Sequence, residues 1–204
     1  MDDDVVRLLP ARRGHFRLES GHHGDLWLDL ERLCLRPEPV RRMAGALATR
    51  LSRHDVGAVC GPLVDGAFVA LLVALELGVQ FTYAERLEAE GDDGLYPVAY
   101  RIPDALRAEV RGKRVAIVND VVNAGSAVRG AFHDLGRCGA ETVALATLMV
   151  LGSWSGEFAA ENGLALETLA SVPNEIWVPS ACPLCARGVP LTTTAPGEAR
   201  DGPD

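Results

Sequence analysis

The chain has 204 residues and a formal net charge of −8, with 48% of its residues hydrophobic and 24% charged, a length that suits one domain with its own core. The acidic balance argues against a nucleic-acid-binding protein, whose surface would carry a basic patch, and no segment reaches the roughly 20 apolar residues that a membrane span requires. Because the start, Met1 to Asp4, is acidic where a secretory signal is basic and then apolar, we expect a cytoplasmic protein.

Apolar runs alternate with segments of helical periodicity along the chain. In chain order they predict a helix (40–51), a strand (56–60), a helix (66–78), a strand (79–83), a strand (114–120), a helix (126–137), a strand (142–151), a helix (about 154–162) and two short apolar pieces (164–170 and 175–179). Residues 84–104 are rich in Glu, Asp, Gly and Pro, which predicts a mobile loop or a hairpin. We expect one domain over 1–191 and a disordered tail over 192–204, which is rich in Thr, Gly and Pro.

Strands that are apolar throughout and alternate with helices are typical of an α/β fold with a central, mainly parallel sheet flanked by helices. Such sheets bind ligands beyond the carboxyl ends of their strands. Two predicted strands end in distinctive loops, at 61–66 and 119–126. Both loops are therefore expected at the ligand-binding edge.

The stretch VAIVNDVVNAGSAVRG (115–130) places a buried strand, an acidic tip and a loop of small residues directly before a helix. The first turn of a helix offers unsatisfied N–H groups and the positive end of the helix dipole, which favour an anion. A phosphate can approach the backbone of 123–126 closely, and Asp120 can accept hydrogen bonds from sugar hydroxyls. An ordinary strand–turn–helix connection accounts for the same residues equally well.

Five cysteines occur, and Cys182 and Cys185 alone form a CxxC pair. A structural zinc ion usually takes four protein ligands, and no second pair or nearby histidine in the sequence completes the set. A redox CxxC is expected at a helix start early in a βαβ unit, whereas this pair lies near the C-terminus beside prolines. We therefore predict a structural role for the pair and no bound metal.

Several segments together resemble one family. RVAIVNDVVNAGSAVRG (114–130) resembles the 5-phosphoribosyl 1-diphosphate motif of type I phosphoribosyltransferases. Two further segments resemble the orotate branch of that family. They are GHFRLESGHHGDLWLDLERL (14–33), near the N-terminus, and CPLCARGVPL (182–191), which resembles a C-terminal tail of some orotate enzymes. GPLVDGAFVA (61–70) sits where the family has its pyrophosphate loop, and FTYAER (81–86) resembles the strand that leads to the hood. The resemblance spans about 14–191 and implies the type I fold, with a small hood from the N-terminal segment and residues about 84–104.

The resemblance also implies a role for each matching residue. Asp120 and Arg86 would be catalytic, with Asp120 on the ribose hydroxyls and Arg86 on the diphosphate. The remaining substrate-binding residues would be Asn119 at the first acidic position, Asn123, Ala124, Gly125 and Ser126 at the 5-phosphate, and Leu63, Val64 and Asp65 at pyrophosphate. Mg²⁺ would bind oxygens of the diphosphate and the hydroxyls, because it asks few ligands of the protein. A homodimer is implied as well, in which the hood loop reaches the neighbour's site.

The chain departs from this family pattern at four places. Asn119 replaces an acidic residue, and Leu-Glu-Ala-Glu (87–90) stands where the family has hood lysines, unless Arg101 or Arg107 replaces them. Val-Leu-Gly-Ser (150–153) lacks the arginine that orotate enzymes place against the carboxylate of the base. Glu19 stands where a base-contacting lysine is common. These differences concern the base and the leaving group, and they leave the fold untouched.

Two hypotheses follow. The first is a phosphoribosyltransferase that moves a phosphoribosyl group between 5-phosphoribosyl 1-diphosphate and a nitrogenous base, with orotate favoured. The alternatives are a transferase for another base, or a weak or inactive relative that binds phosphoribosyl diphosphate or a nucleotide as a sensor.

A few bulky or titratable residues allow two interpretations. Trp27 and Trp177 lie in apolar stretches that predict core positions. Trp154 suits either packing or stacking on a base, and His22 and His23 suit either a solvated surface or a contact to the base.

Overall fold

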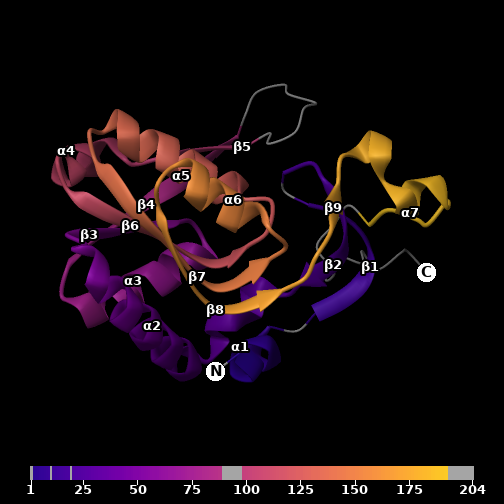
Figure 1. Ribbon diagram of the computed structural model, residues 1–204, viewed down its shortest axis with the longest axis horizontal. Helices are drawn as coiled ribbons and strands as arrows, with labels where there is room; N and C mark the ends of the chain where they lie inside the picture. The colour runs from indigo at the N-terminus through magenta and orange to yellow at the C-terminus, as the bar shows by residue number, and fades with distance from the viewer. Residues whose placement is uncertain (1, 10, 19, 89–97, 193–204) are drawn as a thin grey trace, which may run out of the picture.

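Six strands form the central sheet of the protein, whose computed structural model describes residues 2–9, 11–18, 20–88 and 98–192. The strands are β3 (Ala58–Pro62), β4 (Gln80–Glu88), β5 (Val98–Arg101), β6 (Arg114–Val122), β7 (Glu141–Leu151) and β8 (Ala165–Val172), in the spatial order β5-β4-β3-β6-β7-β8 (Figure 1). All neighbours are parallel except β4 and β5, which are antiparallel. The predicted α/β fold with a mainly parallel sheet is confirmed.

Helices cover both faces of this sheet because its strands are apolar on both faces. Toward one face pack α1 (Asp2–Leu8), α2 (Pro37–Leu51) and α3 (Asp65–Leu77), which share a core with Ala116 and Val118 of β6. Toward the other pack α4 (Arg107–Val110), α5 (Ser126–Arg137) and α6 (Trp154–Glu161), which share a second core with Val115 and Ile117. In Figure 1, α2 and α3 lie below the sheet and α5 lies above it. Successive residues of β6 thus serve two different cores.

Short helical turns connect the remaining segments. They are the 3-10 turns η1 (Leu30–Leu35), η2 (Ser52–His54), η3 (Asp104–Leu106) and η4 (Pro179–Ala181), and the short helix α7 (Pro183–Ala186). Within the described part of the chain, no helix has both the length and the apolarity needed to cross a bilayer.

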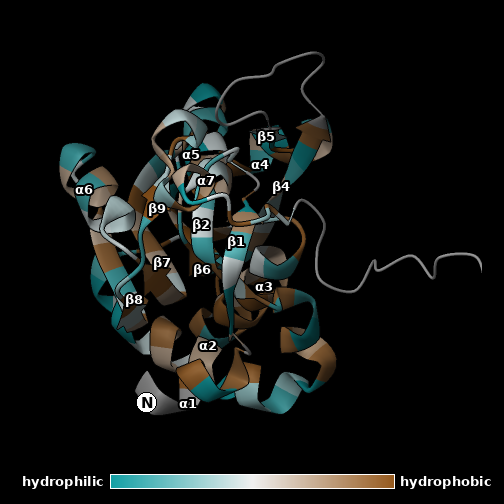
Figure 2. Cartoon of the chain, turned by 90° about the vertical axis from the view of Figure 1, so that its right-hand side faces the viewer, coloured by the Kyte–Doolittle hydropathy of each residue, from teal (hydrophilic) through white to brown (hydrophobic). Residues whose placement is uncertain are grey.

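A second sheet, of three strands, joins the two ends of the chain. Its strands are β1 (Ala11–Arg17), β2 (His23–Leu28) and β9 (Ile176–Trp177), which are antiparallel in this order. Figure 1 places this sheet at the right-hand side of the molecule with α7 beside it, and Figure 2 shows that β1 and β2 are more hydrophilic than central strands such as β7. We call β1, β2 and β9 the hood.

The C-terminal segment also reaches the hood. Thr192 bridges to Phe16 of β1, and its backbone exchanges hydrogen bonds with His15 and Arg17. Residue 192, which the sequence analysis assigns to the tail, is therefore ordered against β1. Residues 193–204, the rest of that predicted tail, lie outside the described residues.

The hood differs in one respect from its prediction. The N-terminal segment forms it as predicted, but its third strand is β9, whereas β4 and β5 pair as a hairpin at the edge of the central sheet. This pairing confirms the hairpin alternative for 84–104. The connection between the two strands, 89–97, is outside the described residues and includes part of the stretch where the family has its lysines.

Candidate functional site

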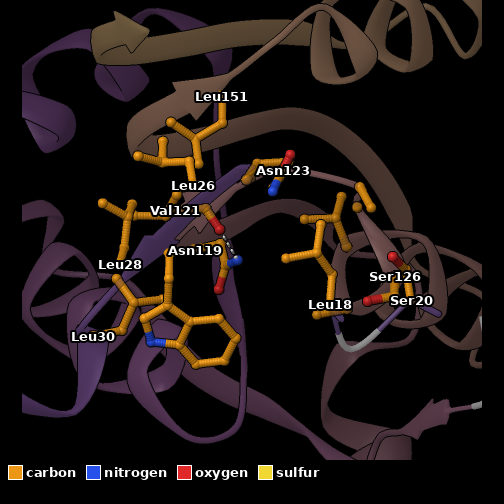
Figure 3. Close-up of a pocket in the computed structure, with 16 residues that line it drawn as sticks. Leu18, Ser20, Leu26, Leu28, Leu30, Asn119, Val121, Asn123, Ser126 and Leu151 are labelled. Carbon is orange, nitrogen blue, oxygen red and sulfur yellow. Dashed lines mark hydrogen bonds between the residues drawn. The ribbon is translucent and has the colours of Figure 1, made fainter. Parts of the chain in front are cut away.

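A cavity of about 260 Å³ lies where the carboxyl ends of β6 and β7 meet the hood. Its polar wall includes Asn119 of β6, Asn123 of the following loop, Ser126 of α5, and Ser20 between β1 and β2. Its apolar wall includes Leu26, Leu28, Leu30 and Leu151. In Figure 3, Leu26, Leu28 and Leu30 stand on one side, Ser20 and Ser126 on the other, and Asn119 between them. The predicted ligand-binding edge of the sheet is hollow.

Gly125 shapes the loop between β6 and α5. Its φ of 75° lies in the left-handed region, where a residue with a side chain is strained. A Cβ atom at this position would also lie 2.0 Å from the ring of Trp154. That ring stacks on Phe158, with centroids 4.7 Å apart, and lies 5.3 Å below the Arg129 guanidinium. Of the two interpretations of Trp154, the structure therefore supports packing, because the ring supports the loop backbone.

The four residues predicted to bind a phosphate come together at one wall of this 260 Å³ cavity, called the smaller cavity below. Asn123, Ala124, Gly125 and Ser126 all line it. The N–H groups of the first turn of α5 have no intrahelical acceptor, and the N-cap residue, Gly125, has no side chain to cap them. Asn123 is held from behind, because its Oδ1 accepts a hydrogen bond from Asn174 Nδ2 at 3.1 Å. The loop therefore presents backbone donors to the cavity from a fixed position.

Asn119, at the first acidic position of the motif, lines the cavity with its side chain. Its Nδ2 donates to the carbonyl oxygen of Val121 at 2.8 Å, the interaction drawn in Figure 3. Its Oδ1 lies against Gly66 at the start of α3, where an added Cβ would be 2.0 Å away. Gly66 thus lets the end of β6 and the start of α3 approach closely.

Asp120, the predicted partner of the ribose hydroxyls, is more deeply buried. It is 4% exposed and does not line either of the two cavities described in this section. Its carbonyl oxygen accepts a hydrogen bond from the Thr147 hydroxyl at 2.8 Å. Burial raises the pKa of the Cys34 thiol, and the charges of Asp65 and Asp120 raise it further. The negative charge of Asp120 is therefore felt at Cys34 in η1.

A second cavity, of about 940 Å³, adjoins the first and shares Leu18 and Trp27 with it. It is lined by the predicted pyrophosphate residues Leu63, Val64 and Asp65, by the predicted Arg86, and by Arg17, Glu85, Leu87 and Tyr100. The Leu63 N–H donates to Ala84 O at 2.9 Å, which ties the loop after β3 to β4. Burial raises the pKa of Asp65, and the charge of Glu31 adds to this. The structure brings the predicted diphosphate residues together around one space.

Two residues that line this space were missed by the sequence analysis. Arg17, at the end of β1, adds a second cation to Arg86. Trp27 lines both cavities and is half-buried, so its predicted core position is wrong. The half-buried Trp177 likewise lines a third hollow, of about 300 Å³, beside the loop after β7. Both tryptophans lie in hood strands, and a thin sheet of three strands cannot bury large rings on both of its faces.

Arg101 and Arg107, considered above as substitutes for hood lysines, have other partners. Arg101 forms an exposed ion pair with Asp104. Arg107 Nη1 lies 2.7 Å from Asp134 Oδ2, and the same oxygen accepts a hydrogen bond from the backbone N–H of Ile102. Neither arginine lines the two cavities. Glu19 lies outside the described residues.

His23 lies beside the CxxC pair, and neither these residues nor His22 line the two cavities. His22 and His23 are buried rather than solvated, and His22 Nδ1 is 3.1 Å from the hydroxyl oxygen of Ser20. His23 adjoins His15, Cys182 and Cys185. The prediction of no bound metal relied on a count of two ligands, and this count is wrong because the fold adds two histidines from the other end of the chain.

Comparison with known proteins identifies similar sequences. Residues 38–160 match the family described as the phosphoribosyl transferase domain. An orotate phosphoribosyltransferase of Carboxydothermus hydrogenoformans is 31% identical over 180 residues, which cover 87% of this chain and 87% of that protein.

Solved structures with the same fold carry names for different bases. The orotate phosphoribosyltransferase of Mycobacterium tuberculosis, in complex with Fe(III) dicitrate, has a TM-score of 0.61 at 20% identity and covers 83% of this chain and 97% of that one. The adenine phosphoribosyltransferase of Thermoanaerobacter pseudethanolicus has a TM-score of 0.66 at 16% identity and covers 84% and 100%. Their likeness to this chain concerns the fold alone.

Proposed function

The chain belongs to the phosphoribosyl transferase domain family, and on this premise we propose that it transfers a phosphoribosyl group between 5-phosphoribosyl 1-diphosphate and orotate. The chain is thus a phosphoribosyltransferase, and orotate is the base named in its curated relatives. The observation that carries the proposal is the pair of adjoining cavities, one beside the loop 123–126 and one beside Leu63 to Asp65. A ligand with a phosphate at each end of a ribose has the shape to occupy both.

We place the 5-phosphate at the start of α5. The first-turn N–H groups and the positive end of the helix dipole stabilise an anion there. The hydroxyl of Ser126 lies on the same wall. Gly125 allows the phosphate to approach the backbone because no side chain intervenes.

The ribose hydroxyls are assigned to the end of β6. Asn119 faces the cavity and offers its amide oxygen as an acceptor. Asp120 follows it, and its negative charge would stabilise positive charge that develops on the ribose as the diphosphate leaves. Electrostatic stabilisation of this kind is often the largest single contribution to catalysis.

The diphosphate is assigned to the larger cavity. Arg86 and Arg17 carry positive charge into this space, from β4 and β1 respectively. A guanidinium matches phosphate oxygens with paired N–H donors. These two arginines would offset the missing hood lysines, because they stabilise the leaving group directly.

Mg²⁺ is the cofactor implied by the family, and the donor set of the larger cavity fits it. The carboxylates of Asp65 and Glu85 both line this space, and Mg²⁺ prefers carboxylate, phosphate and water oxygens. These two residues would hold the ion, with direct contacts or through water. When bound, Mg²⁺ neutralises charge on the diphosphate leaving group. The protein's own residues orient the substrate on either side of it.

The base is assigned to the space beside Trp27, the ring shared by both cavities. An aromatic face stacks on a planar base, which contributes about 1–3 kcal/mol in other proteins. Among the described residues that line the smaller cavity there is no lysine or arginine to pair with the carboxylate of orotate. This observation favours a second candidate, a transferase for a base without a carboxylate, or a protein that binds phosphoribosyl diphosphate as a sensor.

A pyrophosphate-release assay distinguishes these candidates. The purified protein is given 5-phosphoribosyl 1-diphosphate and Mg²⁺ with orotate, uracil, adenine, guanine or hypoxanthine in separate reactions. Orotate should give the highest kcat/KM. If another base is turned over and orotate is not, that base is the substrate in place of orotate. Binding of phosphoribosyl diphosphate by calorimetry without turnover of any base would support the sensor.

We also propose a homodimer. Four large apolar side chains, Val64, Phe68, Leu71 and Leu75, are 46–68% exposed and follow one another at helical spacing along α3. This exposed stripe begins beside the larger cavity, because Val64 also lines that space. A second copy would bury it. Sedimentation should show a dimer, with Leu75→Glu shifting it toward the 21.7 kDa monomer; a monomeric wild type at micromolar concentration would reject the dimer.

A further inference from the structure

Four potential metal ligands gather between the hood and the C-terminal segment. His15 lies in β1 and His23 in β2, while Cys182 and Cys185 lie at the start of α7. Their ligand atoms all lie within 4.8 Å of one another. In Figure 1, α7 lies beside the hood and outside the central sheet.

We propose that His15, His23, Cys182 and Cys185 bind one Zn²⁺ ion. Two cysteines and two histidines are a common ligand set for a structural zinc site. With four protein ligands no coordination position stays open for a substrate, so the site is structural rather than catalytic. It is separate from the proposed Mg²⁺ position in the larger cavity, whose donors are carboxylates.

The distances between the ligand atoms fit a tetrahedron around zinc. Zn–N bonds of about 2.0–2.1 Å and Zn–S bonds of about 2.3 Å place two nitrogens about 3.3 Å apart, and a nitrogen and a sulfur about 3.5 Å apart. His15 Nε2 and His23 Nδ1 are 3.1 Å apart. Cys182 Sγ is 3.4 Å from His15 Nε2, and Cys185 Sγ is 3.3 Å from His23 Nδ1 and 3.8 Å from His15 Nε2. Small shifts of the side chains would place all four around one ion.

The hydrogen bond of His15 Nδ1 leaves the other ring nitrogen, Nε2, available to bind a metal. His15 Nδ1 is 2.8 Å from the carbonyl oxygen of Val189. A carbonyl only accepts hydrogen bonds, so Nδ1 carries the proton, and Nε2 of the neutral ring presents its lone pair to the cluster. Zinc-binding histidines usually donate their second N–H in this way, which orients the ring.

The charges of the ligand set balance those of the ion. Zn²⁺ binding displaces one proton from each thiol, and two thiolates with two neutral imidazoles and Zn²⁺ have no net charge. This suits a site in which His15, His23 and Cys182 are buried. Burial lowers the pKa of His23, and the nearby His15 and Arg17 lower it further. Cys185 is exposed and gives the ion a route into the site.

Zinc at this position would fix the hood to the C-terminal segment. The hood pairs β9 with β2 through two residue pairs, and a two-stranded pairing is marginally stable by itself. His15 is followed two and three positions later by Arg17 and Leu18, which line the cavities. The metal would therefore hold the wall of the substrate cavities without touching the substrate.

Elemental analysis provides the first test. The protein is purified without chelators, in the presence of a reductant, and its zinc content is measured by mass spectrometry. We expect about one zinc per chain. Cys185→Ser is the main variant, because the side chain is exposed and its loss should leave the fold intact; it should weaken zinc binding at least about 100-fold in competition with a chromogenic chelator. Cys34→Ala, a cysteine outside the cluster, is the matched control and should keep its zinc.

Cobalt provides a second readout that does not depend on activity. The chelator-treated, reduced wild type is titrated with Co²⁺ alone. A thiolate-to-cobalt charge-transfer band and intense visible bands of tetrahedral cobalt should saturate at one equivalent, and Zn²⁺ should displace them. If the four side chains instead form a metal-free hydrogen-bonded cluster, the wild type will contain no zinc, show no cobalt bands and bind Zn²⁺ no more tightly than Cys185→Ser. Any of these three results would overturn the proposal.

Discussion

The two walls of the smaller cavity, the proposed site of the 5-phosphate, are built in opposite ways. One wall is a continuous stretch of chain, from Asn119 at the end of β6 to Ser126 at the start of α5. The other is the hood, in which β1 and β2 pair with β9 and with a C-terminal segment more than 150 residues away, as between His23 and Cys185. The first wall depends on local backbone conformation and the second on long-range contacts. Substitutions should therefore act on the two walls by different physical routes.

Gly125→Ala should have the largest effect on the continuous wall. The substitution puts a side chain at a φ of 75° and a Cβ 2.0 Å from the Trp154 ring, so the loop must move. We expect at least about 100-fold weaker binding of 5-phosphoribosyl 1-diphosphate, since backbone strain and steric overlap each cost on the order of 1–3 kcal/mol. Calorimetry measures the affinity.

Gly136→Ala, within the helix that follows Gly125, is the matched control. Nothing lies within 4 Å of the added Cβ, and its φ is not positive. Alanine should stabilise the helix by about 0.5–1 kcal/mol and leave the affinity unchanged. Equal affinities for the two variants would show that the loop 123–126 does not bind the phosphate.

Asp120→Asn tests the acidic tip of the same wall. If the carboxylate stabilises the ribose, the loss of one charge-assisted interaction of about 1.5–3 kcal/mol should reduce binding and turnover about 10- to 100-fold. Asp120 does not line the cavity, so a purely structural role is the alternative. In that case the variant would bind the ligand as tightly as the wild type and would melt at a lower temperature, and Asp120 would only shape the turn.

Asn119→Asp is the complementary change, since it restores the family's acidic pair. Turnover should be equal or higher. The new carboxylate cannot donate to Val121 O, which now accepts a hydrogen bond from Nδ2 at 2.8 Å, so unfolding should become easier by about 1 kcal/mol. Steady-state kinetics and thermal melts of the same preparation check both effects.

Arg86→Gln and Arg17→Gln test how much the central sheet and the hood each contribute to diphosphate binding in the larger cavity. Both side chains line this space, so each loss should weaken pyrophosphate binding about tenfold through one charge-assisted contact. Arg101→Gln, which breaks an exposed ion pair with Asp104, should change the affinity less than about twofold. If Arg17→Gln behaves like this control, the hood contributes no charge to the diphosphate site.

Trp27→Leu should reduce substrate binding less than the arginine substitutions, and its effect should be confined to the hood wall. The ring lies beside both cavities, and losing a stacking surface worth about 1 kcal/mol predicts a rise of about fivefold in the KM for the base. The KM for 5-phosphoribosyl 1-diphosphate should stay constant. Equal rises in both constants would indicate that the hood moved as a whole.

Much of the central domain could be predicted from the sequence. Strands such as β6 and β7 are apolar throughout because both of their faces are covered, and helices such as α2 have a clear apolar face. Gly125 and Ser126 could be placed at the start of a helix because turn chemistry acts over a few residues. These features depend on local periodicity, which is visible in any single segment.

The hood could not be predicted in the same way. β1, Ala-Arg-Arg-Gly-His-Phe-Arg, is polar, and its strand conformation depends on pairing with β2. Trp27 was assigned to the core because an apolar stretch does not reveal whether its sheet is covered on both faces. Arg17 lines the larger cavity only because β1 ends beside the loop after β3.

The sequence by itself determined the α/β class, the turn of small residues before α5 and the resemblance to the phosphoribosyltransferases, because each is encoded in contiguous residues. The tertiary structure decided which residues share a cavity and which share a metal site. Asn119 faces the cavity while Asp120 is buried beside it, and CxxC gains His15 and His23 from the opposite end of the chain. Pairing between strands that are far apart in the sequence brings such residues together, and a local sequence pattern does not reveal this pairing.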